Sequence, residues 1–390
     1  MSKLSSIHTA ADFRHHARKR LPRFVFDFVD GGAGFESALA RNEQAFGQFQ
    51  ITPRIGINPE HVDTTATLFA EQYAAPYGIA PLGLCGLVHP RADIQLALTA
   101  AKFKLPYIVS ATASTSVEAI AGATGSAPWF QLYAPKSSAR LEQLVQRVDQ
   151  LGCPVLVITV DTAAPGKRVR DLRNGLRIPY RPSLSSLFEA ARHPLWSFRR
   201  ISAGGISFPN LATPENLQGP LPFSELMSWQ TGGSLDWEVL HRIRQQWRRK
   251  LVLKGVLSAA DAKHAQGLGI DAVIISNHGG RQLDSAPSPI SVLGDFVAKG
   301  LTPDFLMMDS GIRCGEDIIK TIALGAGFAF VGRPFLYALA AGGVAGAEHL
   351  IGLLMQELRS AMRLTGASSI GACREQLKDG IRKSGAPALG

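Results

Sequence analysis

The sequence predicts an α/β protein folded as a (β/α)8 TIM barrel, with a helical segment before the first strand and a long loop after the fourth. Short apolar runs alternate regularly with helical patterns along most of the chain. Polar residues follow most of these runs, where a barrel enzyme has its active site. The chain of 390 residues with 46% hydrophobic composition can fill one large core, although its length alone would also permit two ordinary domains.

Residues 1–70 are expected to form an N-terminal segment that packs on the barrel. Ala10–Arg20 is predicted to be an amphipathic helix that ends at Leu21-Pro22. Arg23–Asp30 is predicted to be a second, short helix that stops at Gly31-Gly32. Residues 51–69 alternate between apolar and polar side chains, which predicts one or two strands.

From Tyr77 onward, the chain repeats a unit of strand, turn and helix. Eight apolar runs are predicted to be the strands: Tyr77–Pro81, Pro106–Ser110, Pro128–Tyr133, Pro154–Asp161, Leu251–Gly255, Ala272–Asn277, Phe305–Asp309 and Phe328–Gly332. Eight such units in succession predict a (β/α)8 barrel over residues 71–378.

Helical patterns lie between the runs. Apolar residues from Leu141 to Leu151 recur at helical spacing after the third run. Ser258 followed by Asp261 resembles a capping box at the start of a later helix. A final amphipathic helix that ends at Gly366 is predicted by an apolar series at Leu350, Ile351, Leu354, Leu358 and Met362.

The long loop covers residues 162–235 and precedes a helix expected near residues 236–249. A connection of this length is typical of a lid, a binding loop or a disordered segment. From Lys167 to Arg200 it has nine basic residues, two acidic ones, and aliphatic and aromatic side chains between them. Such a segment fits the edge of an anionic bilayer, and equally a solvated loop folded over the protein. Residues 379–390 are expected to be a flexible tail.

The overall charge and the cysteines limit the classes of function. A formal net charge of +10 favours anionic partners, but no nucleic-acid-binding module is recognisable, so no nucleic acid is expected. The four cysteines lie far apart without a CxxC pair, which argues against a disulfide scaffold or a metal site and favours a cytoplasmic location. No secretory signal is expected, and Arg333 divides the longest apolar segments, so neither is expected to span a membrane.

The stretch from Ser276 to Asp284 follows an apolar run and carries groups suited to acid–base chemistry. The imidazole of His278 can move a proton. The guanidinium of Arg281 can bind a carboxylate through two hydrogen bonds. Gly279 and Gly280 allow a sharp turn and close approach to a ligand. Alone, such a turn is more often an ordinary loop, so the rest of the chain decides its interpretation.

The other predicted strands also end in, or are soon followed by, residues that are useful for catalysis or ligand binding. These are Ser110, Gln131, Tyr133, Thr159, Asp161, Arg168, Lys254, Asp309, Gly311, Arg313, Gly332 and Arg333. Taken singly, Tyr133 could be a packing residue and Asp309 a helix cap, but an ammonium group at Lys254 is costly to bury unpaired. Glycines and arginines after the last two strands predict a phosphate site, and a phosphate-bearing cofactor would then lie across the barrel mouth.

These residues resemble those of a known family, the FMN-dependent 2-hydroxy acid dehydrogenases and oxidases, from about residue 21 to residue 366. The resemblance rests on Leu21-Pro22 to Gly31-Gly32-Ala33, Ala80-Pro81-Leu82-Gly83, Trp129 to Tyr133, Thr159-Val160-Asp161, Lys254-Gly255, Ser276 to Asp284, Asp309 to Arg313 and Gly332-Arg333-Pro334. Ser276 to Asp284 is the most specific motif. The chain, including His193 to Ser197, is most similar in character to the membrane-associated L-lactate and mandelate dehydrogenases; glycolate oxidase is a further member.

The resemblance implies that His278 is the base that takes a proton from the substrate, with Asp161 orienting the imidazole. Arg281 would bind the substrate carboxylate with help from Arg168, and Tyr133 would hydrogen-bond the substrate. A homo-oligomer, a tetramer by analogy, is also implied.

The resemblance further implies that the cofactor is FMN. Lys254 would lie beside the N1–O2 side of the flavin, where reduction builds negative charge, and would thereby also act in catalysis. Arg313 and Arg333 would hold the phosphate. The full set expected to bind FMN is Pro81, Leu82, Gly83, Ser110, Gln131, Thr159, Lys254, Ser276, Asp309, Gly311, Arg313, Gly332 and Arg333.

Three positions depart from the family pattern. Phe28 stands where the family usually has a tyrosine whose hydroxyl helps to bind the carboxylate, and Phe26 also replaces a frequent tyrosine. An unreplaced hydrogen bond to a charged group would cost roughly 1.5–3 kcal/mol, so we expect either an atypical substrate or weaker binding. Thr112 is small where glycolate oxidases have a large aromatic residue, which favours a roomier pocket. Gly83 stands where oxidases often have alanine, which favours a dehydrogenase.

Several functions therefore remain open from the sequence. The electron acceptor could be a membrane quinone, oxygen or another protein, and the basic aromatic loop favours the quinone and peripheral contact with a membrane. A lyase that uses Lys254 as a Schiff base is a second hypothesis. A non-catalytic protein that binds anionic surfaces through the charged loop is the third.

Overall fold

The computed structural model describes residues 4–57, 59–133, 135, 137–175, 183–204, 207–211, 235–377 and 381–383. Part of the basic loop, including Arg177, Tyr180 and Arg181, lies outside the described residues. So does most of the tail that was expected to be flexible.

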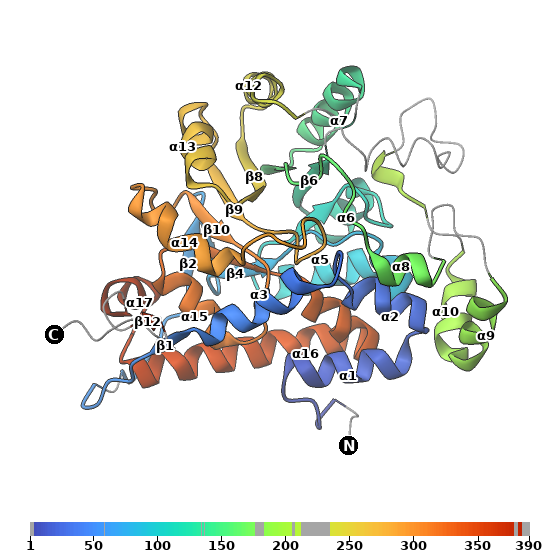
Figure 1. The fold of residues 1–390 in the computed structure, drawn as a ribbon, viewed down its shortest axis with the longest axis horizontal. Helices are drawn as coiled ribbons and strands as arrows, with labels where there is room; N and C mark the ends of the chain where they lie inside the picture. Colours follow the sequence, from blue (N-terminus) through green and yellow to red (C-terminus); the bar gives the residue numbers. More distant parts are fainter. Residues whose placement is uncertain are drawn as a thin grey trace.

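Eight parallel strands form one sheet that closes into a barrel (Figure 1). They are β4 (Tyr77–Ile79), β5 (Ile108–Ser110), β6 (Trp129–Tyr133), β7 (Val155–Thr159), β8 (Lys250–Val256), β9 (Ala272–Ile275), β10 (Leu306–Met308) and β11 (Phe328–Val331). The order is β4-β11-β10-β9-β8-β7-β6-β5, and a bridge between Ile79 and Tyr107 brings the two edges together. The predicted (β/α)8 barrel is confirmed, and only β8 extends beyond its predicted run, by one residue at each end.

A two-stranded hairpin covers one end of the barrel. It consists of β2 (Ala66–Leu68) and β3 (Glu71–Tyr73), which pair antiparallel. The Phe69 ring lies 5.6 Å from the Trp129 ring, and the Tyr73 ring lies 5.7 Å from the Phe328 ring. Trp129 and Phe328 are the first residues of their strands, so the hairpin covers the N-terminal ends. The C-terminal ends remain available for chemistry.

Helices follow each strand and surround the sheet (Figure 1). They are α4 (Cys85–Val88), α5 (Ala92–Lys102), α6 (Val117–Thr124), α7 (Ser138–Gln150), α12 (Trp237–Gln246), α13 (Ala259–Gly267), α14 (Pro289–Ala298), α15 (Gly315–Ala323), α16 (Arg333–Thr365) and α17 (Ile370–Leu377). The predicted apolar face of α7 is buried, because Leu141, Leu144, Val145 and Val148 join the core. The Ser258 hydroxyl caps α13 by accepting a hydrogen bond from the Asp261 amide, as its position predicted.

The N-terminal helices have the predicted bounds, α1 (Ala10–Arg20) and α2 (Arg23–Asp30), and α1 packs on α16. A third helix, α3 (Ser37–Gly47), was not predicted. It leads into β1 (Phe49–Ile51), which pairs antiparallel with β12 (Ile381–Lys383). Three residues of the expected tail therefore belong to a strand. Pairing between segments more than 300 residues apart leaves no local pattern from which it could be predicted.

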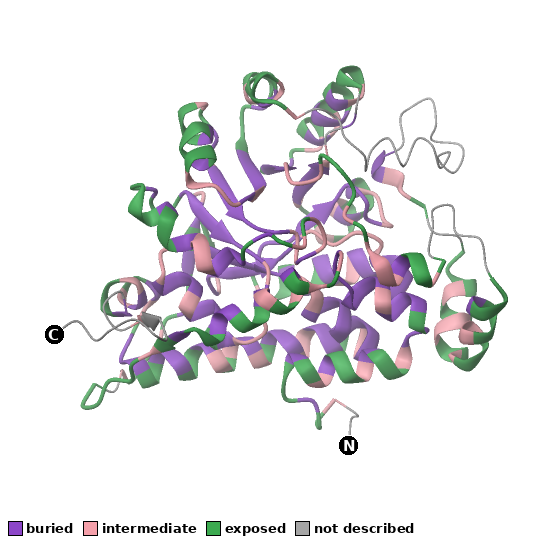
Figure 2. Ribbon diagram, viewed as in Figure 1, coloured by how far each residue is buried: buried purple, intermediate pink, exposed green. Residues whose placement is uncertain are grey.

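The C-terminal helix is longer than the sequence predicted. The expected helix near residues 350–366 is the second half of α16, which has 33 residues and a kink at Gly343, where φ is +60°. Within the described part of the chain, α16 is the one helix long and apolar enough to cross a membrane by length and composition. The helix instead packs against α1, α5 and α15, and Figure 2 shows many of its residues as buried, as in the core helix of a globular domain.

The described part of the long loop contains three short helices, α8 (Val169–Arg173), α9 (Leu184–Arg192) and α10 (Pro194–Ser202), and a 3-10 turn, η1 (Pro209–Leu211). α8 packs against α2, whereas α9 and α10 project from one side of the molecule (Figure 1). α10 has no buried residue and α9 has one, Ser186, as the exposed and half-exposed colours in Figure 2 show. Trp196 of α10 contacts the core, since it packs against Phe24 and donates to the Leu87 carbonyl oxygen at 2.9 Å, whereas most other apolar side chains of the two helices are exposed.

Candidate functional site

A buried row of hydrogen-bonding side chains crosses the C-terminal ends of β5, β6 and β7. The Ser110 hydroxyl donates to Gln131 Oε1 at 3.0 Å, and Gln131 Nε2 donates to Thr159 Oγ1 at 2.8 Å. Thr112 extends the row, with its Oγ1 3.0 Å from the Ser110 hydroxyl. All four residues are buried, so the row is a preorganised set of polar groups in an apolar setting.

Lys254, on β8, is the buried cation of this region. Its Nζ lies 2.9 Å from Asp309 Oδ2 and donates to the Ser276 hydroxyl at 3.0 Å. Burial lowers the pKa of Lys254, but the negative charges of Asp309 and Asp161 outweigh burial, and the pKa is raised overall. The ammonium group therefore keeps its charge and is not left unpaired, which is how an apolar strand can hold it.

His278 and Asp161 form a second pair of polar groups beside Lys254. His278 Nδ1 lies 3.0 Å from Asp161 Oδ1. Burial raises the pKa of Asp161, but the charge and hydrogen bond of His278 and the charge of Lys254 lower it overall, so the carboxyl group is ionised. A carboxylate can only accept, so Nδ1–H donates to Asp161, and in the neutral form of the ring Nε2 has the lone pair that can take a proton. The Tyr133 ring stacks near the imidazole, with centroids 6.3 Å apart.

The turn that carries His278 has an unusual backbone. His278, Gly279 and Gly280 all have positive φ angles, +60°, +67° and +74°. A Cβ atom at Gly280 would lie 2.6 Å from the backbone nitrogen of Leu39, so only glycine fits there. This explains why two glycines follow the histidine.

Arg281 and Arg333 converge near the C-terminal end of α2, and Arg168 lies close enough to act on the charge of Arg281. Arg281 donates to the carbonyl oxygens of Phe28 at 2.7 Å and Gly31 at 3.0 Å, and Arg333 also donates to Gly31, at 2.8 Å. Burial, and then the positive charges of Arg168 and Arg333, lower the pKa of Arg281 well below its ordinary value. A set of like charges held this close is favourable for binding an anion.

The remaining residues predicted for the cofactor lie on the loops after β4, β10 and β11. Arg313 donates to Glu43 on α3 at 2.7 Å. Gly83 lies so close to Thr112 that a Cβ atom there would be 2.3 Å from the threonine hydroxyl. At Gly332 a Cβ atom would find no neighbour nearer than 3.5 Å, the Leu82 side chain. The structure thus brings the loop of Pro81 and Leu82 beside the loop of Gly332.

Comparison with known proteins decides the family. A model described as FMN-dependent dehydrogenase matches residues 17–379. The chain belongs to this family.

Relatives and solved structures of the family resemble the chain over almost its whole length. The L-lactate dehydrogenases of Caulobacter vibrioides and Alcaligenes faecalis are both 36% identical to it, covering 95% of the chain and 97% and 98% of the relatives. The crystal structure of the monotopic membrane protein (S)-mandelate dehydrogenase has a TM-score of 0.91 at 34% identity, covering 97% of this chain and all of that one. A mandelate oxidase variant with (S)-mandelic acid has a TM-score of 0.79 at 33% identity, covering 95% of this chain and 97% of that one. The protein is an FMN-dependent 2-hydroxy acid dehydrogenase.

The groups of this FMN-dependent dehydrogenase fit the cofactor of its family. Ser110, Gln131 and Thr159 supply donors and acceptors of the kind that the polar edge of a flavin ring needs. Lys254 supplies a fixed positive charge beside them. The same charge argues against the alternative of a Schiff-base lyase, because such an enzyme needs a neutral lysine amine.

Two polar side chains with structural importance in the dehydrogenase were not predicted. Gln282 donates to the Asp161 carbonyl oxygen at 2.8 Å and accepts from the Gly166 amide at 2.9 Å, which ties the His278 turn to the loop after β7. Asp30 accepts from Arg14, Arg170 and the Tyr337 hydroxyl. The position of Gln282 inside the most specific motif was the available signal, whereas nothing in the sequence marks Asp30.

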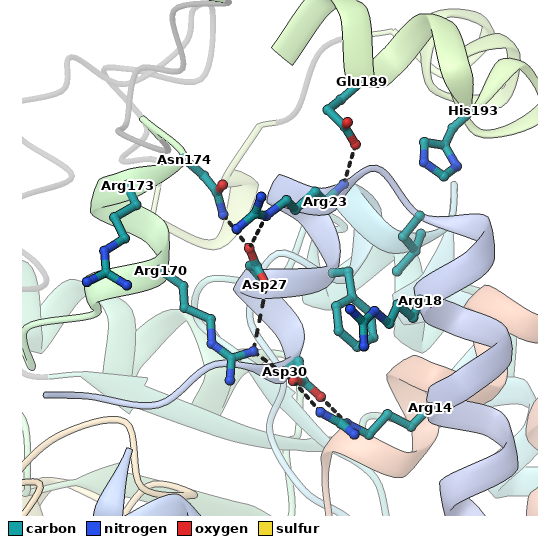
Figure 3. A pocket seen from close by; sticks show the side chains of 12 residues that line it. Arg14, Arg18, Arg23, Asp27, Asp30, Arg170, Arg173, Asn174, Glu189 and His193 are labelled. Carbon is teal, nitrogen blue, oxygen red and sulfur yellow. Dashed lines mark hydrogen bonds and ion pairs between the residues drawn. The ribbon is translucent and has the colours of Figure 1, made fainter. Parts of the chain in front are cut away.

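A separate cavity of about 620 Å³ lies between α1, α2, α8 and α9 (Figure 3). Its lining includes Asp30, Arg14 and Arg170, whose hydrogen bonds Figure 3 shows. Burial raises the pKa of Asp30, but its hydrogen bonds from Arg14 and Tyr337 outweigh burial and bring the pKa to about 2. The cavity has none of the strand-end residues in its lining, so it is distinct from the candidate active site.

Proposed function

We propose that the enzyme oxidises an L-2-hydroxy acid to the 2-oxo acid with His278 as the base. The observation that carries this proposal is the hydrogen bond between His278 and the largely buried Asp161, with Arg281 three residues further along the same turn. A proton acceptor and a carboxylate binder at this spacing match the two functional groups of a 2-hydroxy acid.

Each group has a defined task in this proposal. His278 Nε2 takes a proton from the substrate, and Asp161 orients the ring and stabilises the imidazolium ion that results. Arg281 binds the carboxylate with help from Arg168, and the Tyr133 hydroxyl donates a hydrogen bond to the substrate. Burial raises the pKa of Tyr133, so this hydroxyl keeps its proton.

FMN, when bound, supplies the chemistry of accepting two electrons from the substrate. Ser110, Gln131, Thr159 and Lys254 would hold its ring. Arg313 and Arg333 would bind the phosphate. The rest of the FMN site would be lined by the other residues predicted for the cofactor: Pro81, Leu82, Gly83, Ser276, Asp309, Gly311 and Gly332.

The substrate is proposed to have a larger side chain than lactate. Phe28 brings no hydroxyl to the carboxylate; its ring instead lies 5.1 Å from the Arg281 guanidinium carbon. Thr112 is buried and small, which leaves room for a longer or aromatic side chain. We expect Phe28→Tyr to improve kcat/KM for lactate by about tenfold to a hundredfold, the equivalent of one hydrogen bond to a charged group. An unchanged kcat/KM for both lactate and mandelate would contradict this.

The acceptor is proposed to be a membrane quinone, with the protein lying on the cytoplasmic face of the membrane as a homo-oligomer. Apolar side chains of α9 and α10 are unusually exposed: Leu184 is 88%, Phe198 70% and Ile201 81% exposed. Together with the basic residues of the same loop, they suit an anionic bilayer surface. The relative described as a monotopic membrane protein supports the same arrangement.

Anaerobic spectroscopy tests the proposal. The purified, FMN-loaded protein is mixed with glycolate, L-lactate, (S)-mandelate and longer L-2-hydroxy acids without oxygen, and the flavin absorption is followed. We expect at least one aromatic or long-chain acid to bleach the flavin. If none of the acids bleaches it, the proposed reaction is wrong. Adding oxygen or a short-chain quinone to the bleached enzyme then separates an oxidase from a quinone-linked dehydrogenase by which of them restores the colour faster.

A further inference from the structure

Ser310 completes a ring of hydrogen bonds that supports the turn carrying His278. Its hydroxyl donates to Asp309 Oδ1 at 2.8 Å and accepts from the Gly279 amide at 2.9 Å. Asp309 uses its other oxygen for Lys254. The ring closes on the opposite side, where the Ser276 hydroxyl accepts from both Lys254 Nζ and the His278 amide, each at 3.0 Å.

The ring therefore fixes two successive backbone amides of the catalytic turn. The amide of His278 is held through Ser276, and the amide of Gly279 is held through Ser310. Both tethers end on the Lys254–Asp309 ion pair, which is buried. Since Lys254 lies on β8 and Asp309 directly follows β10, the pair gives the turn a rigid reference point.

The backbone conformation of Ser310 is a second observation that favours a specific role for its side chain. Its φ angle is +75°, a region that glycine adopts freely and that costs a serine conformational energy. A glycine at this position would relieve the strain. The chain instead has a serine in this strained conformation, and its hydroxyl acts both as donor and as acceptor, which favours a role for that hydroxyl.

We propose that Ser310 is a positioning residue for the reaction. Its hydroxyl couples the Gly279 amide to the Lys254–Asp309 pair and so sets where the His278 imidazole stands relative to the substrate. This inference rests on the proposed role of His278 as the base. A displacement of the imidazole by a fraction of an ångström slows proton transfer, while Arg281 stays held by its own hydrogen bonds to the Phe28 and Gly31 carbonyl oxygens.

Two variants separate positioning from a structural role. Ser310→Ala removes the hydroxyl and keeps the backbone strain, whereas Ser310→Gly removes both. Each should lower kcat by about tenfold to a hundredfold with a much smaller change in KM. Ser310→Gly should be at least as heat-stable as the wild type, because the strain is relieved. Ser291→Ala, which removes a hydroxyl from α14, serves as the matched control and should change neither quantity.

Hydrogen–deuterium exchange of the FMN-loaded enzyme supplies a readout independent of turnover. In both Ser310 variants, exchange in residues 276–284 should accelerate by roughly two- to tenfold, the range of one ordinary hydrogen bond. The proposal is overturned if both variants keep the wild-type kcat, or if exchange in this segment is unchanged. If the wild type oxidises no hydroxy acid, the proposed function fails by itself, and the exchange data still decide whether Ser310 holds the turn.

Discussion

Charged side chains at the ends of the barrel strands are paired and largely buried, whereas those on α9 and α10 are exposed or partly exposed beside apolar residues. At the strand ends, Lys254 is paired with Asp309 and His278 with Asp161, and the cation and both carboxylates are largely buried. On α10, Arg199 lies beside the exposed Leu195 and Phe198, and the helix has no buried residue.

The difference shows which region has its interaction partners within the chain and which would need a second surface. A buried charge is tolerated only with its partners in place, so the strand ends are fixed before any ligand arrives. An exposed apolar face beside unburied cations gains nothing in water and is favourable only against a second surface. Four experiments can break or sharpen this contrast.

The largest effect is expected from removing the base. His278→Asn should lower kcat by about a hundredfold to ten-thousandfold, because no other imidazole is placed to take the proton. FMN content and unfolding free energy should change little, since the side chain is partly exposed. Steady-state kinetics at saturating hydroxy acid measure it, with His15→Asn on the exposed face of α1 as the control. A variant that retains more than about one tenth of the rate would show that His278 is not the base.

Breaking the buried ion pair should have the next largest effect. Lys254→Met leaves Asp309 charged and unpaired, which should cost about 3–5 kcal/mol of unfolding free energy. Urea unfolding measures this loss. The double variant Lys254→Met/Asp309→Asn should recover most of it, because the uncompensated charge is gone. If the single and double variants lost the same unfolding free energy, the uncompensated charge of Asp309 would not be the cause of the loss.

Asp30 predicts a dependence of stability on pH. Its pKa is about 2 in the folded protein against an ordinary value of 3.8, so folding favours the ionised form. This contribution, about 2 kcal/mol, is fully present above about pH 4 and is lost as the pH falls towards 2. Asp30→Asn should therefore be less stable than the wild type at neutral pH, with a difference that narrows below about pH 4. A difference that stays constant as the medium is acidified would refute this linkage.

The smallest effect on folding is expected on the exposed helices. Changing Phe188, Phe198 and Ile201 together to glutamine should alter the unfolding free energy by less than about 0.5 kcal/mol for each substitution. The same change should abolish sedimentation with vesicles that contain anionic lipid. Leu98→Gln and Leu364→Gln replace other exposed apolar residues on α5 and α16 and should leave vesicle binding intact. Undiminished sedimentation of the triple variant would exclude α9 and α10 as the membrane contact.

The sequence revealed most of the barrel because the information is local. Each strand is an apolar run that ends in a polar turn, so the run and the reactive residue after it are visible together, as at Lys254 and His278. The two N-terminal helices were likewise delimited by Leu21-Pro22 and Gly31.

What the sequence did not reveal depends on contacts between distant segments. The helix α3 has no strong apolar stripe, and β12 exists only because β1 lies beside it. The several partners of Asp30 come from three different helices, and the two bonds of Ser310 depend on a backbone angle that no residue pattern predicts. The roles of the strand-end residues remain predictions that the variants above can test.

The hairpin of β2 and β3 has a consequence for the order of events during turnover. Because it covers the N-terminal ends of the strands, we expect the hydroxy acid and the electron acceptor to reach the flavin through the same opening, at the C-terminal ends. We therefore expect the 2-oxo acid product to leave before the electron acceptor binds. Double-reciprocal plots at several acceptor concentrations should accordingly give parallel lines, the mark of a ping-pong cycle.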